Sequence, residues 1–217
     1  MEEGLKGLFI TIEGPDGAGK SSLVRRLQKA IQEETDRPLV MTREPGGSDI
    51  AEEIRDILLN PVHTKMDART EALLLAAGRR QHIVEKIRPA LSRGDIVLCD
   101  RFVDSSIAYQ GQARGIGVEE VKAINAFAIE GLKPDLTIYL DVEAEVGLSR
   151  IRDKKSNRSQ DRLELEAVTF HEEVRTGYAQ LISQEPERFS IIDASQAEEK
   201  VFEDTWAVIK AKLNDTY

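Results

Sequence analysis

The 217-residue sequence contains a single cysteine, Cys99, and few aromatic residues, which make up 5% of the chain. One cysteine cannot form an intrachain disulfide, which excludes a small secreted scaffold held together by such bonds. Its place in an apolar run indicates a buried strand thiol. No apolar run approaches the ~18 consecutive residues that a membrane span requires. The first ten residues, MEEGLKGLFI, are acidic before they are apolar, unlike a secretory signal. We therefore expect a cytoplasmic protein without a membrane partner.

Positive charge is also scarce in this sequence. Lys and Arg number 30 against 39 Asp and Glu, which leaves a net charge of −9. This balance disfavours a general affinity for nucleic acids or anionic membranes, so we expect no nucleic-acid partner. An anionic ligand would have to be held by a local cluster of basic residues. The three histidines are scattered and show no metal-ligand spacing.

Short apolar runs alternate with helical patterns along the whole chain. The runs show no polar alternation, which is typical of a parallel sheet covered on both faces. No linker, repeat or low-complexity tract interrupts them. The pattern predicts a single domain, 1–217, with a three-layer α/β/α fold and a five-stranded parallel sheet flanked by helices. The expected strands are 8–12, 38–42, 96–100, 136–141 and 189–193, and the expected helices are 19–34, 49–59, 67–92, 118–130, 143–152, 163–185 and 197–213.

The first expected strand runs directly into the stretch GPDGAGKS at 14–21, which matches G-x-x-x-x-G-K-[ST] at every fixed position. In this strand-to-helix context, small residues let backbone N–H groups surround phosphate oxygens, and the helix N-terminus adds partial positive charge. We expect Lys20 to reach the β- and γ-phosphates of a nucleoside triphosphate and the Ser21 hydroxyl to ligate Mg²⁺. An ordinary glycine turn is the weaker alternative. The residues expected to bind this nucleotide are Gly14, Pro15, Asp16, Gly17, Ala18, Gly19, Lys20, Ser21 and Ser22.

Phosphate loops (P-loops) occur in GTPase switches, mechanical ATPases and small kinases. A GTPase would carry N-K-x-D and a downstream D-x-x-G, and both motifs are missing. A small kinase needs a second anion site and a mobile basic lid. Residues 150–162 form a basic island in this acidic chain; taken alone it indicates a solvated loop, but beside a phosphate loop it indicates a lid. Its basic residues are Arg150, Arg152, Lys154, Lys155, Arg158 and Arg162.

Further motifs extend along the chain in a consistent order. They are TREPGG at 42–47, AAGRRQH at 76–82, DRFVDSSIAYQG at 100–111, PDLTIYLD at 134–141, QDRLE at 160–164 and IIDA at 191–194. Together with the phosphate loop they resemble the bacterial thymidylate kinases over nearly the whole chain. The resemblance implies a nucleoside monophosphate kinase-like fold, the reaction ATP + dTMP → ADP + dTDP with Mg²⁺, and a homodimer packed through helices. The Ala- and Leu-rich 67–92 pattern is compatible with such an interface or with a core helix.

The resemblance also implies roles for individual residues. Arginine forks match phosphate oxygens, so Arg55 and Arg101 would hold the dTMP phosphate. The residues expected to be catalytic are Lys20, Asp100, Arg101 and Arg158. Asp100 would act on Mg²⁺ through water. The other residues expected around dTMP are Arg79 and Gln110 at the polar edge of thymine, Ser106 and Leu75 beside the base, Tyr109 near the sugar, and Asp16 and Glu44 near the 3′-hydroxyl and the acceptor region.

Without the resemblance, several of these residues have simpler explanations. Arg55 would be a plain surface arginine, and Arg79 would belong to a charged helix face. Tyr109 and Gln110 would be a core aromatic and a loop cap. Asp100 closes a buried strand, where a bare carboxylate is costly, so a functional role is favoured there on chemistry alone.

Two departures from the family pattern leave alternatives open. The phosphate loop carries Gly17 where one branch of the family has Arg, which points to the lid branch with Arg158 as the transition-state cation and Arg150 and Arg152 as rivals. Leu75 stands where many relatives stack a Phe on thymine. A kinase for another pyrimidine nucleotide or a deoxynucleoside therefore stays open, as does a regulatory or motor ATPase.

Adenine recognition is weakly marked in the sequence. Ala194 and Gln196 are the candidates, because they lie in the segment where related kinases pass backbone near the adenine. The tight E-P-G-G turn also suggests a cis peptide bond between Glu44 and Pro45.

Overall fold

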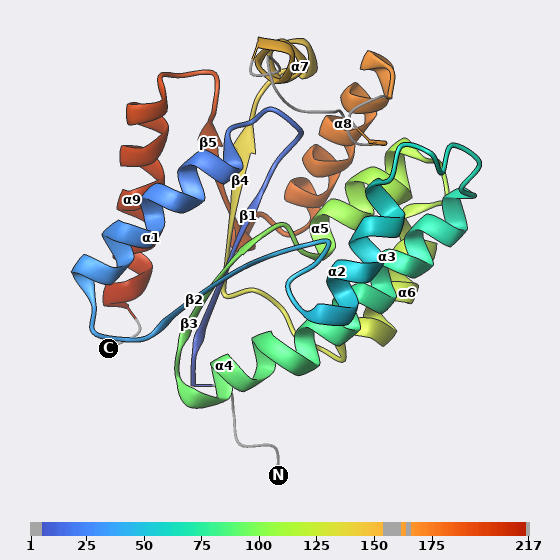
Figure 1. Ribbon diagram of the computed structural model, residues 1–217. Coiled ribbons are helices and arrows are strands. Elements are labelled where there is room, and N and C mark those ends of the chain that lie inside the picture. The colour runs from blue at the N-terminus through green and yellow to red at the C-terminus, as the bar shows by residue number, and fades with distance from the viewer. Residues whose placement is uncertain (1–5, 154–161, 164–165, 216–217) are drawn as a thin grey trace.

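The computed structural model describes residues 6–153, 162–163 and 166–215. In this part of the chain one sheet of five parallel strands has the order β2-β3-β1-β4-β5 (Figure 1). This confirms the predicted parallel α/β fold. The strand bounds are β1 Leu8–Glu13, β2 Leu39–Arg43, β3 Ile96–Asp100, β4 Leu136–Asp141 and β5 Phe189–Asp193.

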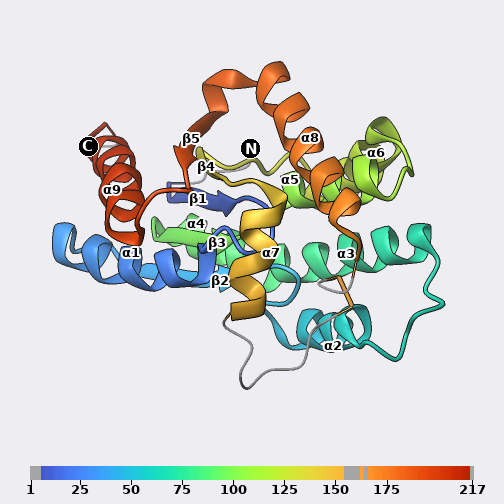
Figure 2. The same ribbon diagram turned by 90° about the horizontal axis from the view of Figure 1, so that it is seen from above.

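Helices cover both faces of the sheet, which produces the three layers (Figures 1 and 2). One face packs on α1 and α9, and the other on α4, α5 and α8 and the turns beside them. The described helices are α1 Lys20–Glu34, α2 Asp49–Leu59, α3 Ala68–His82, α4 Arg88–Arg93, α5 Val103–Ser106, α6 Val118–Ile129, α7 Ala144–Asp153, α8 Val168–Gln184 and α9 Glu198–Asn214. Two π-helical segments, η1 Ile83–Ile87 and η2 Ile107–Ala113, and a 3₁₀ turn, η3 Pro186–Arg188, join them.

The central strand β1 shows why both faces must be covered. Its successive side chains point to opposite faces. Ile10 and Ile12 pack with Leu27 and Ile31 of α1, whereas Phe9 packs with Ile87 in the opposite layer. All of these side chains are at most 1% exposed. The unbroken apolar run in the sequence is therefore explained by burial on both sides, as predicted.

Two segments differ from the sequence expectation in detail. The pattern at 67–92 is helical as expected, but the π-helical segment η1 divides it into α3 and α4. Pro89 at the start of α4 has no N–H to continue the regular ladder, which accounts for the irregular turn before it. The helical pattern expected from residue 163 begins as α8 only at Val168. Within the described residues, no helix is both long and apolar enough to span a membrane.

The phosphate loop is packed directly against the backbone of α7, which lies across the carboxyl ends of the strands (Figure 2). Gly17 has a φ of +77°, a conformation that favours glycine, and a Cβ there would overlap the backbone of Gly147. In the other direction, a Cβ on Gly147 would overlap the Asp16 carbonyl oxygen. Two glycines thus let the loop and the helix approach at backbone distance.

We predict that Gly147→Ala lowers the free energy of unfolding by about 1–3 kcal/mol, because the new methyl group meets rigid backbone. Urea denaturation measures this change. Gly78→Ala in α3 is the matched control, since its Cβ would lie 3.5 Å from Ile54 Cγ2, an ordinary contact. The control should be neutral or up to about 1 kcal/mol more stable, because Ala favours a helix. Equal midpoints for the two variants would contradict the close packing of loop and helix.

Candidate active site

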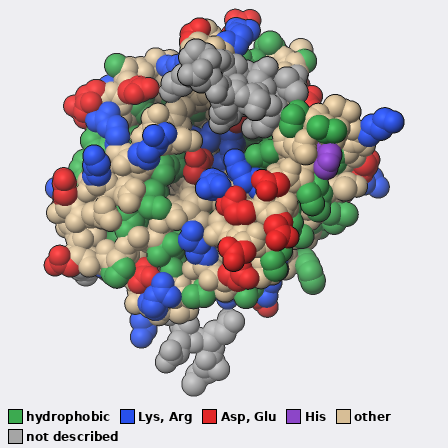
Figure 3. Space-filling model, in the orientation of Figure 1, with side chains coloured by type: hydrophobic (Ala, Val, Ile, Leu, Met, Phe, Trp, Pro, Cys, Tyr) green, Lys and Arg blue, Asp and Glu red, His purple; other side chains and the backbone are tan. Residues whose placement is uncertain are grey.

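A cleft of about 440 Å³ opens beyond the carboxyl ends of the strands. This is the position where open parallel sheets bind ligands. Figure 3, drawn in the orientation of Figure 1, shows Lys and Arg side chains gathered in a hollow near the centre of the view. The basic residues that line the cleft are Lys20, Arg25, Arg43, Arg55, Arg79, Arg101 and Arg150. Although the protein is acidic overall, its cleft concentrates basic side chains. This is the local basic cluster that we expected an anionic ligand to need.

The phosphate loop forms the floor of the cleft between β1 and α1. Lys20 Nζ donates to the carbonyl oxygens of Gly14 at 2.9 Å and Pro15 at 2.8 Å. Burial, together with the nearby charge of Arg101, lowers the pKa of Lys20 to about 8. Within the described chain, Ala18 is the one residue between Gly14 and Ser21 whose N–H has a backbone acceptor. The loop can therefore offer most of its N–H groups to phosphate oxygens.

Ser21 and Asp100 bring two kinds of oxygen together at the mouth of the loop. Ser21 Oγ donates to Asp100 Oδ2 at 3.4 Å. Asp100 Oδ1 is buried and has no hydrogen-bond partner among the described residues. A hydroxyl and a carboxylate with an unused oxygen suit a hard cation such as Mg²⁺, which takes oxygen ligands and keeps several waters. No group of three or more His, Cys, Asp or Glu residues elsewhere in the described chain could hold a metal ion.

Arg101, directly after β3, is hydrogen-bonded to the phosphate loop. Its guanidinium donates to Gly14 O at 3.0 Å and to Asp16 Oδ1 at 2.6 Å. The Tyr109 hydroxyl accepts from Arg101 at 3.0 Å and donates to Asp16 Oδ2 at 2.9 Å. Burial alone would raise the pKa of Asp16, but the charges of Arg101 and Lys20 hold it below its ordinary value. The Asp16 carboxylate therefore stays ionised between two cations.

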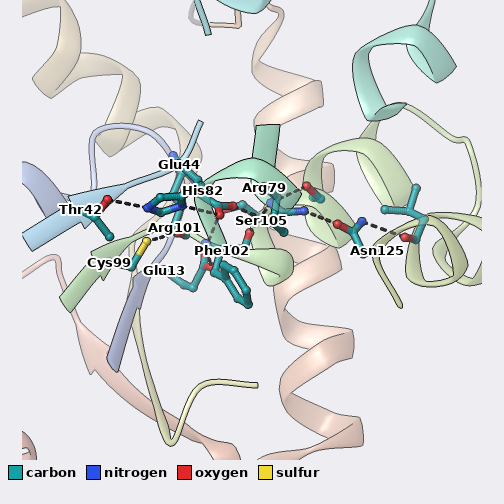
Figure 4. Close-up of polar contacts among 12 residues, drawn as sticks. Glu13, Thr42, Glu44, Arg79, His82, Cys99, Arg101, Phe102, Ser105 and Asn125 are labelled. Atoms are coloured by element: carbon teal, nitrogen blue, oxygen red, sulfur yellow. Dashed lines mark hydrogen bonds and ion pairs between the residues drawn. The ribbon is translucent and has the colours of Figure 1, made fainter. Parts of the chain in front are cut away.

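The backbone of Arg101 has a φ of +71°, which is uncommon for a residue with a side chain. Glu13, at the end of β1, helps hold the chain there: it accepts from the Phe102 N–H at 2.7 Å and from Ser105 Oγ at 2.6 Å (Figure 4). The Cys99 thiol donates to the Arg101 carbonyl at 3.0 Å. Burial raises the pKa of Cys99, so the thiol keeps its proton, and the expectation of a buried strand thiol is confirmed.

Arg79 of α3 also lines the cleft and is only 2% exposed. Its Nε donates to Glu44 Oε2 at 2.7 Å, its Nη1 to Asn125 Oδ1, and its Nη2 to Ser106 Oγ at 3.1 Å and to the Phe102 carbonyl at 3.0 Å (Figure 4). These bonds occupy four of the five N–H groups of the guanidinium. Arg79 is therefore held rigidly, with one N–H left over at Nη1.

The Glu44 carboxylate is itself supported from behind. His82 Nδ1 lies 3.0 Å from Glu44 Oε1, and His82 Nε2 lies 2.6 Å from Thr42 Oγ1. A carboxylate only accepts, so Nδ1 donates to Glu44. The peptide bond between Glu44 and Pro45 is cis, as the sequence suggested, and Arg55 donates to the Pro45 carbonyl at 2.7 Å. A buried chain of contacts thus fixes the E-P-G-G turn beside the cleft.

Comparison with known proteins decides the family. The thymidylate kinase family model matches residues 12–205. A thymidylate kinase of Anoxybacillus flavithermus is 56% identical over 94% of this chain and 96% of its own length, and one of Clostridium novyi is 53% identical over 94% and 99%. The crystal structure of thymidylate kinase from Ehrlichia chaffeensis superposes with a TM-score of 0.75 at 31% identity, covering 94% of this chain and 98% of that one.

The chain belongs to the thymidylate kinase family. Its cleft brings together most of the residues that the sequence predicted for a thymidylate kinase. Gly14, Pro15 and Ala18 are buried in the loop and do not line the cleft. The predicted residues that line it are Asp16, Gly17, Gly19, Lys20, Ser21, Ser22, Glu44, Arg55, Leu75, Arg79, Asp100, Arg101, Ser106, Tyr109 and Gln110. Their roles toward nucleotides stay predictions.

The residues expected to form the lid are described only in part. Arg158, the expected transition-state cation, lies outside the described residues. Arg150 lines the cleft and donates to the carbonyls of Ala194 at 2.8 Å and Ser195 at 3.4 Å. Arg152 is exposed. Of the two adenine candidates, Ala194 is thus joined to the cleft through Arg150, and the Gln196 side chain donates back to the Asp193 carbonyl.

Several residues that organise the site were not predicted. Asn125, Tyr178 and Glu71 all lie in helical patterns without a local signal. Glu13 did carry a signal: β1 ends in an acid, as do three other strands, directly before the phosphate loop. Because a carboxylate at the end of a buried strand needs partners, Glu13 could have been recognised.

The buried carboxyl of Glu13 generates a pH-dependent prediction. Burial and the charge of Asp104 raise its pKa from 4.5 to about 7, despite hydrogen bonds from Ser105 and Tyr178. A raised folded-state pKa stabilises the fold below about pH 4.5, and that stabilisation is lost as the pH rises through about 7. Glu13→Gln retains an acceptor oxygen without the ionisation. We therefore expect wild-type stability to fall by about 1–3 kcal/mol relative to Glu13→Gln between pH 5 and 8.

Urea denaturation of both proteins across this pH range measures the difference. Parallel stability curves would show that Glu13 does not titrate in the fold as its surroundings imply.

Proposed function

We propose that this chain transfers the γ-phosphoryl group of ATP to the phosphate of dTMP, giving ADP and dTDP. The observation that carries the proposal is that a phosphate loop and a separate set of arginines face one cleft. Two anionic ligands can therefore be held with their phosphates adjacent. The membership of the thymidylate kinase family supports thymidylate as the acceptor.

The phosphate loop supplies the donor side. Its N–H groups, the ammonium of Lys20 and the N-terminus of α1 converge on the position expected for the β- and γ-phosphates. Lys20 has three N–H donors, two of which bond the Gly14 and Pro15 carbonyls. One donor is left for a phosphate oxygen. The loop carbonyls thus orient the Lys20 ammonium and still leave one N–H available for phosphate.

Arg101 and Arg55 supply the acceptor side. Both line the cleft, and Arg101 is bonded to the phosphate loop itself through Gly14 and Asp16. An acceptor phosphate held by Arg101 would therefore lie next to the donor. The acceptor is already an anion, so the reaction needs no general base. The bond from the γ-phosphorus to its bridging oxygen breaks, a bond to a dTMP phosphate oxygen forms, and ADP leaves with the bridging oxygen.

Ser21 Oγ and Asp100 would hold Mg²⁺, with Asp100 acting through water. When bound, Mg²⁺ neutralises charge on the β- and γ-phosphate oxygens. The fit is supported by the unpartnered buried oxygen of Asp100. Around dTMP, Arg79, Gln110, Ser106 and Leu75 would surround the base. Tyr109 and Asp16, which bond one another, would contact the sugar.

Residues 1–217 would act as one kinase domain with a lid at about 150–162. We also infer a homodimer packed through helices, supported by exposed large apolar side chains on neighbouring helices: Leu73 of α3 is 57% exposed and Phe127 of α6 is 89% exposed. Such surfaces are often buried in an assembly. A mass of a single chain in light scattering would exclude the dimer.

The reaction is tested with ATP and a panel of acceptors: dTMP, dUMP, dCMP, thymidine and no acceptor. We expect dTMP to give the highest kcat/KM, because the arginines need a phosphate and the site resembles that of thymidylate kinases. If thymidine or dCMP is turned over more efficiently than dTMP, the enzyme is a kinase for that pyrimidine compound and the assignment of dTMP as acceptor is wrong. ATP hydrolysis that ignores every acceptor would instead indicate a regulatory or motor ATPase.

The lid cation is tested by comparing Arg158→Ala with Arg150→Ala. We expect Arg158→Ala to lower kcat by about 10²–10⁴-fold with little change in the KM for dTMP, as for a cation that acts only in the transition state. Arg150 bonds the Ala194 and Ser195 carbonyls, so its loss should mainly raise the KM for ATP. Steady-state kinetics with each substrate varied measures both. The reverse pattern would make Arg150 the cation.

A further inference from the structure

Glu71 is a charged residue almost completely buried beside the cleft, with 1% exposure. It lies one turn before Leu75 and two turns before Arg79 on α3, so the three share one helix face. Leu75 and Arg79 line the cleft, whereas Glu71 lies behind it. A buried carboxylate is costly unless it is paired and hydrogen-bonded. Its partners therefore indicate what it is for.

Two arginines keep Glu71 ionised. Arg162 pairs with Glu71 Oε2, and Arg114 donates to both oxygens at 3.3 Å. Burial by itself would raise the pKa of Glu71, but the hydrogen bond from Gln110 and these two arginines hold it below its ordinary value. Arg162 is in turn fixed by the Leu58 carbonyl, to which it donates at 2.9 Å. The carboxylate is thus ionised, with an arginine partner for each of its oxygens.

The third partner of Glu71 is the side-chain amide of Gln110. Gln110 Nε2 donates to Glu71 Oε1 at 2.7 Å. An ionised carboxylate has no proton to donate, so the carbonyl end of the amide cannot take this position. Gln110 is 2% exposed and lines the cleft from η2. With Nε2 tied to Glu71, Oε1 is the acceptor that the amide can offer to a base in the cleft.

We propose that Glu71 is a specificity-determining positioning residue, which sets the orientation of the Gln110 amide so that the site accepts thymine and rejects cytosine. Thymine carries an N–H donor at N3, which matches the Oε1 acceptor. Cytosine carries a bare N3 acceptor, which would face Oε1 without a hydrogen between them. A buried pair of acceptors is penalised, so the fixed amide distinguishes two bases of nearly equal size. This inference rests on the proposed function.

The test compares dTMP with 5-methyl-dCMP, which keeps the methyl group and changes the polar edge of the base. In Glu71→Gln, residue 71 can donate as well as accept, so the Gln110 amide is free to turn over. We expect the ratio of kcat/KM for dTMP to that for 5-methyl-dCMP to fall at least about tenfold, chiefly through KM. The reason is that a turned amide presents an N–H donor to N3 of the base, which suits cytosine and not thymine. If the role of Glu71 were purely structural, kcat/KM would fall equally for both substrates and their ratio would not change.

A swapped variant, Glu71→Gln with Gln110→Glu, provides the rescue. The new amide at position 71 can then donate to the new carboxylate at position 110, which still offers an acceptor oxygen to the base, and the cluster keeps its net charge. The swap should restore most of the preference for dTMP. Glu166→Gln is the charge-matched control: Glu166 pairs with Arg114 at 2.7 Å and not with Gln110, so its loss should leave the ratio within about twofold of wild type.

The outcomes separate this inference from the proposed function. If wild-type protein does not phosphorylate dTMP, the proposed function fails. If wild type does so and folded Glu71→Gln keeps the wild-type ratio, the role of Glu71 is overturned. Should Glu71→Gln fail to fold, as judged by circular dichroism, the swapped variant decides: retained preference for dTMP supports the inference, and lost preference in a folded swap refutes it.

Discussion

The hydrogen bonds from Arg101 to Gly14 and Asp16 join the two halves of the site. Gly14 and Asp16 belong to the phosphate loop after β1, whereas Arg101 follows β3, its neighbour in the sheet. Parallel strands end at the same edge, so the two segments meet without any long excursion of the chain. A transfer between two phosphates requires that both be held in one frame. The arginine that is proposed to hold the acceptor is fixed to the loop that is proposed to hold the donor.

This arrangement needs support because Arg101 has left-handed backbone. Glu13 supplies it from the end of β1, with hydrogen bonds to Phe102 N and Ser105, and Tyr178 of α8 donates to the same carboxyl at 2.8 Å. Strand β1 therefore contributes to the site in two ways. It leads into the phosphate loop, and its last residue, Glu13, supports the backbone after Arg101. Strained backbone at functional sites persists where the surroundings over-determine it, and this network provides such surroundings.

Buried charge is a recurring feature of the acceptor wall. Arg79 with Glu44, and Arg162 with Glu71, are ion pairs whose members are all at most 9% exposed. Pairs of this kind contribute little net stability, because desolvation offsets their attraction. Their value lies in orientation: Glu44 holds the Arg79 guanidinium, and Glu71 holds the Gln110 amide nitrogen. On the inference above, the Gln110 amide oxygen is thereby left as the acceptor for the base.

The amino-acid sequence by itself determined the strands, their parallel arrangement and the phosphate loop, because these depend on neighbouring residues: apolar runs of five or six, and glycines at set spacing before Lys20. The family resemblance located Arg55, Arg79, Arg101 and Gln110, all of which line the cleft. Only the tertiary structure decided what positions them. Glu71 and Gln110 are 39 residues apart, and Glu13 and Tyr178 are 165 apart. No local pattern records such pairings, since they arise when strand ends and helix faces converge on one edge of the sheet.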